Sequence, residues 1–330
     1  MGVDTIRTNV LVLGGTGMLG SMLVDYLSKK PDLEITATVR SEEVARNLEI
    51  QLPSVKWKVF DANSSDPDKA LEVISGNQWV INAIGIIKPL IHDDNPSEVE
   101  RAIKINSLLP HLLAKKAQEK GSRVIQIATD CVYSGDKGHY IETDVHDALD
   151  VYGKTKSLGE VYSPNVFHLR CSIIGPEPKE FKSLLEWFLG QSTNAHVNGF
   201  TNHRWNGLTT LHFAKICYGI ISNDIQLLHL QHVVPGGEIT KFDLLKAFSK
   251  YFNRRDISIT PFEAEVPIDR TIFTINDGLN LHLWKSAGYG HPPSVPEMVE
   301  ELANYDYSFH IPGLIIKNER EMKISPSPKW

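Results

Sequence analysis

The sequence predicts an α/β protein with a doubly wound parallel sheet and a smaller C-terminal lobe. Short apolar runs rich in β-branched residues alternate with segments of helical periodicity from residue 8 to about residue 170, a rhythm typical of a parallel sheet covered on both faces. The first run, at 8–13, passes directly into the turn GGTGMLG at 14–20. A glycine-rich turn between a first strand and an amphipathic helix indicates a Rossmann-type dinucleotide fold.

Composition narrows the class of protein. The chain has 330 residues, with 34 basic and 40 acidic side chains and a formal net charge of −6. This length suggests roughly two structural units, and the acidic balance argues against a nucleic-acid partner. No run approaches the ~20 apolar residues that cross a bilayer, and Cys131, Cys171 and Cys217 are too scattered for a disulfide framework or a zinc site. We therefore expect a cytoplasmic protein with no membrane or nucleic-acid partner and no metal-site residues, while metal dependence stays open.

The remaining elements follow the same rhythm. Strands are expected at 34–39, 56–60, 79–84, 123–128, 166–169 and 226–233, and helices at 97–119, 181–188 and 240–252. Residues 198–207, rich in Asn and Gly, are expected to form loops, and the segment after Tyr307 a surface extension. We divide the chain into a dinucleotide-binding domain at 1–172, to which 207–234 returns, and a smaller lobe made of 173–206 and 235–330.

The glycine-rich turn predicts where a dinucleotide binds. Glycines allow close approach of backbone N–H groups to a diphosphate, and the N-terminus of the next helix adds positive charge. We expect these residues of the turn to contact the cofactor: Gly14, Thr16, Gly17, Met18 and Leu19. Arg40 ends the second strand where an NAD-binding fold places a carboxylate, which favours NADP(H). NAD(H) stays open, because Glu42 and Glu43 follow shortly after.

Further cofactor contacts are expected beyond the third and fourth strands. Asp61 is placed to accept a hydrogen bond from the adenine amino group, but a plain turn aspartate explains it about equally well. The other expected contacts are Ala62, Ala83, Ile84, Gly85 and Asn106. For Asn106, support of a water relay to the catalytic lysine and an ordinary polar position in a helix are equally good interpretations.

Tyr-x-x-x-Lys occurs three times, so the spacing alone does not identify a catalytic pair. A tyrosine protonates a carbonyl oxygen near neutral pH when a fixed cation lowers its pKa from ~10. Tyr26 lies on the apolar stripe of the first helix, and the pair starting at Tyr133 encloses a turn sequence. We expect Tyr152 as the proton donor, its pKa lowered by Lys156, which would also hold the nicotinamide ribose. Thr129, after the fifth strand, would hold the substrate carbonyl.

Several segments resemble the extended short-chain dehydrogenase/reductase family. They are Gly14–Gly20, Asn82-Ala83, Thr129-Asp130, Tyr152–Lys156 with Gly159-Glu160, and Leu169-Arg170. Within that family, ATDCVYSG at 128–135 and VYGK at 151–154 resemble the dTDP-4-dehydrorhamnose reductase group. The similarity to this group has specific motifs from residue 8 to about residue 175 and continues weakly to about residue 303. The resemblance implies NADPH-dependent reduction of a nucleotide-linked 4-keto-6-deoxysugar, in deoxysugar or polysaccharide precursor biosynthesis.

The resemblance also implies a nucleotide-diphosphate sugar as substrate, held in the smaller lobe. The candidate ligands are Lys179, Lys182, His203, Arg204, Trp205 and Arg270. Dehydration is disfavoured, because Cys131 stands where related dehydratases carry a basic glutamate. A nucleotide-sugar epimerase uses the same Thr, Tyr and Lys, and a non-catalytic NADP-binding regulatory subunit, like that of methionine adenosyltransferase, has a similar Tyr-Gly-Lys-Thr-Lys. Both alternatives stay open, as does a homodimer.

Overall fold

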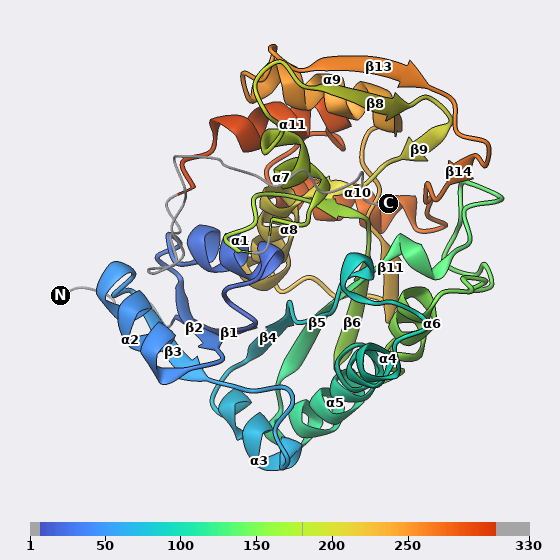
Figure 1. Cartoon of the computed structure of the whole chain (residues 1–330). Helices are drawn as coiled ribbons and strands as arrows, with labels where there is room; N and C mark the ends of the chain where they lie inside the picture. The colour runs from blue at the N-terminus through green and yellow to red at the C-terminus, as the bar shows by residue number, and fades with distance from the viewer. Residues whose placement is uncertain (1–6, 180, 308–330) are drawn as a thin grey trace.

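The computed structural model describes residues 7–179 and 181–307, and its centre is a parallel sheet of seven strands in the order β11-β6-β5-β4-β1-β2-β3 (Figure 1). The strands are β1 (Thr8–Leu13), β2 (Leu33–Val39), β3 (Val55–Val59), β4 (Trp79–Asn82), β5 (Arg123–Ala128), β6 (Val166–Arg170) and β11 (Leu230–His232). The predicted α/β class and the parallel sheet are confirmed. The strand order reverses between β1 and β4, which in such sheets opens a ligand crevice at the carboxyl ends of the strands.

Both faces of the sheet are buried, as the apolar strands require. Successive side chains of a strand point to opposite faces. Val10 and Val12 pack with the apolar cluster that includes α1 (Met18–Leu27) and α8 (Thr210–Ser222), whereas Leu11 and Leu13 pack with α5 (Leu109–Lys120). Figure 1 shows these helices on the two sides of the sheet.

Other helices complete the dinucleotide-binding side. They are α2 (Glu42–Gln51), α3 (Pro67–Ala70), α4 (Pro96–Ala102) and α6 (Val151–Leu158), with short turns η1 (Leu71–Ile74), η2 (Lys88–Leu90) and η4 (Asp130–Val132). The single helix expected at 97–119 is instead α4 and α5 joined by the π-helical turn η3 (Ile103–Leu108). A π-turn widens a helix locally and often marks a functional site.

The smaller lobe contains strands where the sequence suggested loops. It is built from α7 (Leu184–Leu189), β8 (His196–Phe200), β9 (His203–Trp205), β12 (Ile239–Thr240), α9 (Lys241–Tyr251), β13 (Ser258–Phe262), β14 (Ile268–Asp269), α10 (Asp277–Ser286) and α11 (Val295–Asn304). The loop prediction at 198–207 was therefore wrong. Gly199 interrupts the apolar pattern because a Cβ there would lie 2.8 Å from Cα of Phe242 on α9, and β8 is formed by pairing with the distant β13.

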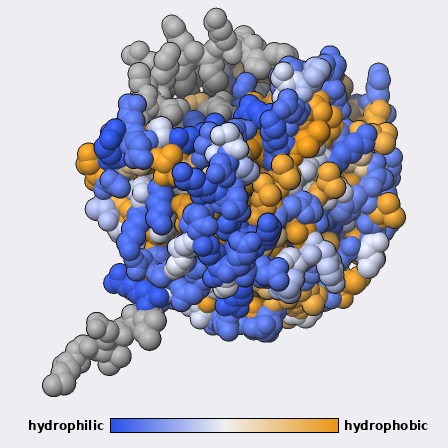
Figure 2. All heavy atoms as spheres, turned by 90° about the horizontal axis from the view of Figure 1, so that it is seen from below, coloured by the Kyte–Doolittle hydropathy of each residue, from blue (hydrophilic) through white to orange (hydrophobic). Residues whose placement is uncertain are grey.

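Two short strands, β7 (Ile173–Ile174) and β10 (Leu208–Thr209), pair at the junction of the lobes. The face turned down in Figure 1 is mostly hydrophilic and broken by separate apolar patches (Figure 2), as is usual for a protein surface. Over the described ranges, no helix is long and apolar enough to cross a membrane. The expected surface extension after Tyr307 lies outside the described residues.

Candidate active site

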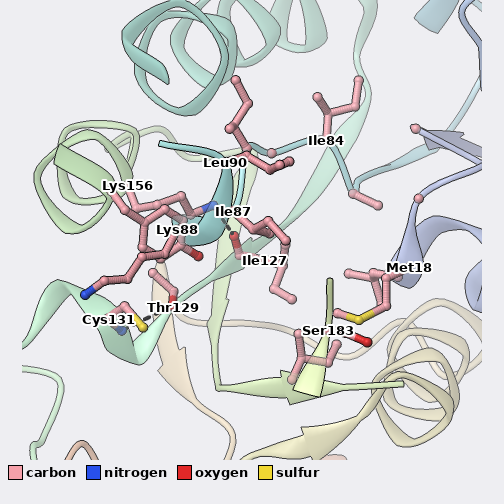
Figure 3. Close-up of a pocket in the computed structure, with 18 of the residues that line it drawn as sticks. Met18, Ile84, Ile87, Lys88, Leu90, Ile127, Thr129, Cys131, Lys156 and Ser183 are labelled. Atoms are coloured by element: carbon pink, nitrogen blue, oxygen red, sulfur yellow. Dashed lines mark hydrogen bonds between the residues drawn. The ribbon is translucent and has the colours of Figure 1, made fainter. Parts of the chain in front are cut away.

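A cavity of about 360 Å³ is lined by residues that follow the carboxyl ends of β1, β2, β4 and β5 and by residues of the smaller lobe. It brings together most of the residues singled out from the sequence: Gly14, Thr16, Gly17, Met18, Leu19, Arg40, Asp61, Ala62, Ala83, Ile84, Gly85, Thr129, Tyr152, Lys156, Lys179, His203, Arg204, Trp205 and Arg270. Figure 3 shows Lys156, Thr129 and Cys131 grouped on one side of it, and Met18 and Ser183 on the other. Residues as distant in the sequence as Gly14 and Arg270 thus line the same cavity only because of the fold.

The glycine-rich turn is held tightly against β2. The backbone N–H of Gly14 donates to Thr38 Oγ1, and that of Gly15 to Thr38 O, both at 2.9 Å. Gly14 has a φ of 81°, and a Cβ at Gly20 would lie 2.0 Å from Gly14 O, so neither position accepts another residue without strain. Gly17 provides no side-chain cap for α1. The first N–H groups of that helix therefore face the cavity as donors for an anion.

Arg40 and Asp61 lie where the adenosine end of a dinucleotide is expected. Both are exposed and line the cavity beyond β2 and β3. Glu42 and Glu43, the residues that kept NAD(H) open, are exposed in the first turn of α2 and do not line it. Asp61 accepts the backbone N–H of Asn63 at 2.9 Å, so it also serves as the turn aspartate that the sequence allowed.

Helix α6 is fixed at its start by Asp150. The Asp150 carboxylate accepts the backbone N–H of Gly153 and the ammonium of Lys88, both at 2.7 Å. A Cβ at Gly153 would lie 2.5 Å from the carbonyl oxygen of Cys131, so this glycine lets the helix approach the loop after β5. The result places Tyr152 and Lys156, one helical turn apart, on the wall of the cavity.

The electrostatics of Tyr152 differ from the sequence expectation. Burial raises the pKa of the phenol, and the nearby Cys131, Asp130 and Asp150 raise it further, while the hydroxyl of Thr129 lowers it. The ammonium of Lys156 donates to Ile127 O at 3.3 Å. The pKa of Tyr152 is therefore raised, whereas the sequence led us to expect that Lys156 lowers it.

Lys156 itself is affected chiefly by desolvation. Burial lowers the pKa of its ammonium, and the carboxylate of Glu160, one turn further along, raises it. Glu160 is held in turn by the buried guanidinium of Arg170, at 2.5 and 2.6 Å. Both residues belong to segments noted in the sequence, Gly159-Glu160 and Leu169-Arg170. The ion pair between Glu160 and Arg170 thus holds the C-terminal end of α6, the helix that bears Tyr152.

Cys131 is a poor base and a poor nucleophile. Burial, with Asp130 beside it, raises the pKa of its thiol to about 12. Its backbone N–H donates to Thr129 Oγ1 at 3.1 Å, and the Thr129 hydroxyl donates to Asp130 at 3.2 Å. A neutral thiol in this position supports the sequence argument against proton abstraction, and hence against dehydration.

The two other Tyr-x-x-x-Lys pairs lie away from the cavity. The hydroxyl of Tyr133 accepts from buried Arg170 at 2.7 Å, and its ring stacks on Tyr140 with centroids 4.2 Å apart. Lys30 lies over the ring of Tyr26, with its nitrogen 4.1 Å from the ring centroid. Both tyrosines have packing roles, consistent with the choice of Tyr152.

Asn106 has a different role from the water relay considered above. It is buried in η3 and does not line the cavity. Its Oδ1 accepts the backbone N–H of Ile86 at 2.8 Å, and its Nδ2 donates to Ile86 O at 3.0 Å. The side chain therefore holds the loop after β4, which forms one wall of the site.

The predicted substrate ligands separate into three groups. Lys182 is exposed outside the cavity, so we withdraw it as a ligand. Lys179 donates to Thr16 Oγ1 at 3.2 Å, which places it on the cofactor turn. The remaining four, His203, Arg204, Trp205 and Arg270, line the cavity. Each already has a polar partner in the protein. Hydrogen bonds join His203 Nε2 to Val266 O at 3.2 Å, Trp205 Nε1 to Ser172 Oγ at 2.7 Å and Arg270 Nε to Tyr133 O at 2.9 Å, and Arg204 forms an ion pair with Glu238.

Two lysines of the cavity were missed by the sequence reasoning. Lys88 follows β4 and pairs with Asp150; Lys241 begins α9. Burial lowers the pKa of Lys241, and the facing Asp130 raises it. The position of Lys88 just beyond a parallel strand was a usable signal, but nothing local marks Lys241. Within 7–179 and 181–307, no three His, Cys, Asp or Glu side chains form a group that could hold a metal ion.

A family model described as the RmlD substrate binding domain matches residues 8–304. The chain belongs to this family. A curated dTDP-4-dehydrorhamnose reductase from Aggregatibacter actinomycetemcomitans is 30% identical over 168 residues, 49% of this chain and 50% of that protein. The enzyme of the same name from Escherichia coli (strain K12) is 30% identical over 156 residues, 46% and 45%. The chain thus spans about half the length of the curated relatives it matches.

Solved structures with the same fold extend the comparison over nearly the whole chain. A dTDP-4-dehydrorhamnose reductase from Bacillus anthracis in complex with NADP has a TM-score of 0.67 and 18% identity, covering 90% of this chain and 98% of that one. A UDP-glucuronic acid 4-epimerase from Bacillus cereus in complex with UDP-glucuronic acid and NAD has a TM-score of 0.67 and 15% identity, with the same coverage of 90% and 98%. These likenesses confirm the Rossmann-type fold of the RmlD-family chain.

Proposed function

We propose that the protein is an NADPH-dependent reductase of a nucleotide-linked 4-keto-6-deoxysugar, acting in deoxysugar or polysaccharide precursor biosynthesis. The observation that carries the proposal is that Thr129, Tyr152 and Lys156 line the same cavity as the glycine-rich turn. Curated relatives in the family are named dTDP-4-dehydrorhamnose reductases, and a solved structure of that name contains NADP.

The residues of the cavity suit NADP(H). The tight turn and the uncapped start of α1 fit a diphosphate, and Arg40 supplies a cation for a 2′-phosphate. Ala83, Ile84 and Gly85, directly after β4, line the cavity beside the glycine-rich turn. When bound, NADPH supplies a hydride. NAD(H) is less favourable, because no carboxylate stands at the end of β2 to bind a ribose 2′-hydroxyl.

In this proposal Tyr152 donates the proton. As the hydride adds to sugar C4, the carbonyl oxygen becomes negative, and the phenol gives its proton to that oxygen. The raised pKa keeps the phenol protonated at neutral pH, and an alkoxide is a stronger base than a phenolate, so the transfer is favourable. Thr129 donates a hydrogen bond to the same oxygen, and Lys156 positions the nicotinamide ribose.

Reduction is favoured over epimerisation by the curated relatives in the family, which are named reductases. A regulatory subunit is less favoured, because it has no need for the complete Thr129, Tyr152 and Lys156 set on one cavity wall. His203, Arg204, Trp205, Arg270 and Lys241 then face the nucleotide sugar.

An absorbance assay tests the proposal. The protein is mixed with NADPH and freshly prepared dTDP- or UDP-4-keto-6-deoxyglucose, and the absorbance of the reduced cofactor is followed. A reductase consumes one NADPH per sugar. Isomerised sugar with unchanged cofactor would indicate an epimerase, and bound NADPH with no turnover across a panel of keto-sugars would indicate a regulatory subunit.

A further inference from the structure

A three-stranded sheet of the smaller lobe, in the order β12-β9-β14, contributes one wall of the cavity. Successive side chains of its central strand β9 point to opposite faces. His203 and Trp205 are buried, whereas Arg204 between them is exposed and pairs with Glu238. The face that carries His203 and Trp205 is therefore the buried one, and both of these residues line the cavity.

The two outer strands of this sheet bring two cations to the same wall. Lys241 directly follows β12 and Arg270 directly follows β14, and both line the cavity. The last residue of each strand is paired with Arg204, so the two cations lie on either side of β9. Burial lowers the pKa of His203, and the charges of Lys241 and Arg270 lower it further. Both charges therefore lie close to this imidazole.

Both cations have donors left for a ligand. Arg270 is held by its Nε, which donates to Tyr133 O at 2.9 Å, and by its stem, since a Cβ at Gly135 would lie 3.1 Å from its Cγ. Among residues 7–179 and 181–307, neither the Nη atoms of Arg270 nor the ammonium of Lys241 has a hydrogen-bond or ion-pair partner. Lys241 is half-buried, and withdrawing a charge from water costs free energy unless an opposite charge compensates it. This wall therefore suits an anion.

His203 and Asp130 show where that anion binds and which groups hold it. Because the carbonyl of Val266 can only accept, His203 Nε2 donates to it, and the lowered pKa keeps the ring neutral at pH 7. The remaining nitrogen, Nδ1, is then an acceptor and cannot bind an anion. Asp130 raises the pKa of Lys241, which burial lowers, so Lys241 faces the loop that begins at Thr129. The anion therefore belongs to a ligand that also reaches the carbonyl site.

We propose that Lys241 and Arg270 together bind the diphosphate of the sugar nucleotide. A guanidinium presents a fork of donors to phosphate oxygens, and an ammonium adds a point charge. The inference rests on the proposed function and adds Lys241, which no motif in the sequence marks. It also narrows the sequence candidates of the sheet to Arg270, because Arg204 pairs with Glu238 and His203 is neutral.

Binding measurements on matched variants test the inference. Lys241→Met, Lys241→Gln and Arg270→Met each remove a charge, Lys241→Arg keeps it, and Lys246→Met removes an exposed charge of the same helix that does not line the cavity. Dissociation constants are measured for dTDP, UDP and thymidine by calorimetry, and for NADPH by its fluorescence. Thermal unfolding without ligand verifies that each variant is folded, and the Gln variant serves if Lys241→Met is not.

The expected result separates the ligands. Loss of one charge-assisted hydrogen bond raises the Kd for the better-bound nucleoside diphosphate about tenfold or more in the three neutral variants. Lys241→Arg and Lys246→Met stay within about threefold of the wild type. Thymidine, which has no phosphate, and NADPH bind all variants equally. Lys241→Met does not lower the Tm without ligand, because it removes a charge that has no partner in the described part of the protein.

Two other results would overturn the inference. One is binding of dTDP and UDP that is unchanged in Lys241→Met and Lys241→Gln while the wild type binds either of them well. The other is a loss of NADPH affinity alone, which would assign Lys241 to the cofactor. If the wild type binds NADPH but neither dTDP nor UDP, the nucleotide-sugar part of the proposed function is wrong as well, and this outcome is distinct from the other two.

Discussion

Asn106 and Ile86 form a closed pair of hydrogen bonds, in which the side-chain amide of Asn106 accepts from the backbone N–H of Ile86 at 2.8 Å and donates to its carbonyl at 3.0 Å. The pair is buried and lies between the π-helical turn η3 and the loop after β4. Asn106 thus pairs both backbone polar groups of Ile86, which lies outside the strands of the sheet.

Replacing this side chain leaves two buried groups unpaired. We expect Asn106→Ala to lower the free energy of unfolding by about 3 kcal/mol, since each orphaned buried group costs about 1–3 kcal/mol. Urea denaturation measures the change. Ser107→Ala is the matched control, because Thr155 O, which accepts from Ser107, also accepts from Gly159 N. Ser107→Ala should lower the free energy of unfolding by about 1 kcal/mol. Equal decreases in the two variants would refute the argument.

The choice between the two dinucleotides depends on Arg40. We expect Arg40→Asp to weaken NADPH binding at least tenfold and to strengthen NADH binding, because a carboxylate repels a 2′-phosphate and binds a 2′-hydroxyl. Ratios of Kd for the two cofactors measure the shift. Arg46→Asp makes the same charge change on an exposed position of α2 outside the cavity and should leave the ratio unchanged. An unaltered ratio in Arg40→Asp would contradict the assignment of NADP(H).

Two buried histidines predict how stability depends on pH. Burial lowers the pKa of His168 and of His232 from 6.5 to about 4. The positive charge of Arg170 lowers the pKa of His232 further, because Arg170 Nη1 lies 2.9 Å from His232 Nε2. Between pH 6.5 and about 4 the unfolded chain binds protons that the folded protein does not, so the free energy of unfolding falls as the pH is lowered through this window.

The slope of that fall tests the contribution of His232. Each such histidine adds up to about 1.4 kcal/mol per pH unit. We expect His232→Gln to flatten the dependence of the free energy of unfolding on pH between 6.5 and 4, measured by denaturation at several pH values. His196→Gln, at an exposed position, should leave the slope as it is. A slope that His232→Gln does not change would show that other groups cause the acid sensitivity.

Much of the dinucleotide-binding half follows from local pattern. The apolar runs and the glycine-rich turn predict the strands, the sheet and the cofactor end of the cavity, because both signals depend on neighbours in the sequence. The choice of Tyr152 over Tyr26 and Tyr133 also follows from local context, since one alternative lies on an apolar helical stripe and the other next to a turn.

The remaining features depend on contacts between distant residues. Strand β8 pairs with β13, about 60 positions away, and this pairing has no signature in its own Asn- and Gly-containing residues. Lys179 meets Thr16 across the two lobes, and the pKa of Tyr152 is set mainly by its burial. Neither could be derived from spacing along the chain.

The most direct test of the central claim separates turnover from cofactor binding in Tyr152→Phe. This variant keeps the ring and removes only the hydroxyl that donates the proton. The account predicts an NADPH Kd within a few-fold of the wild type and a kcat with the 4-keto sugar nucleotide reduced about 10²- to 10⁴-fold. A kcat within tenfold of the wild type would contradict it.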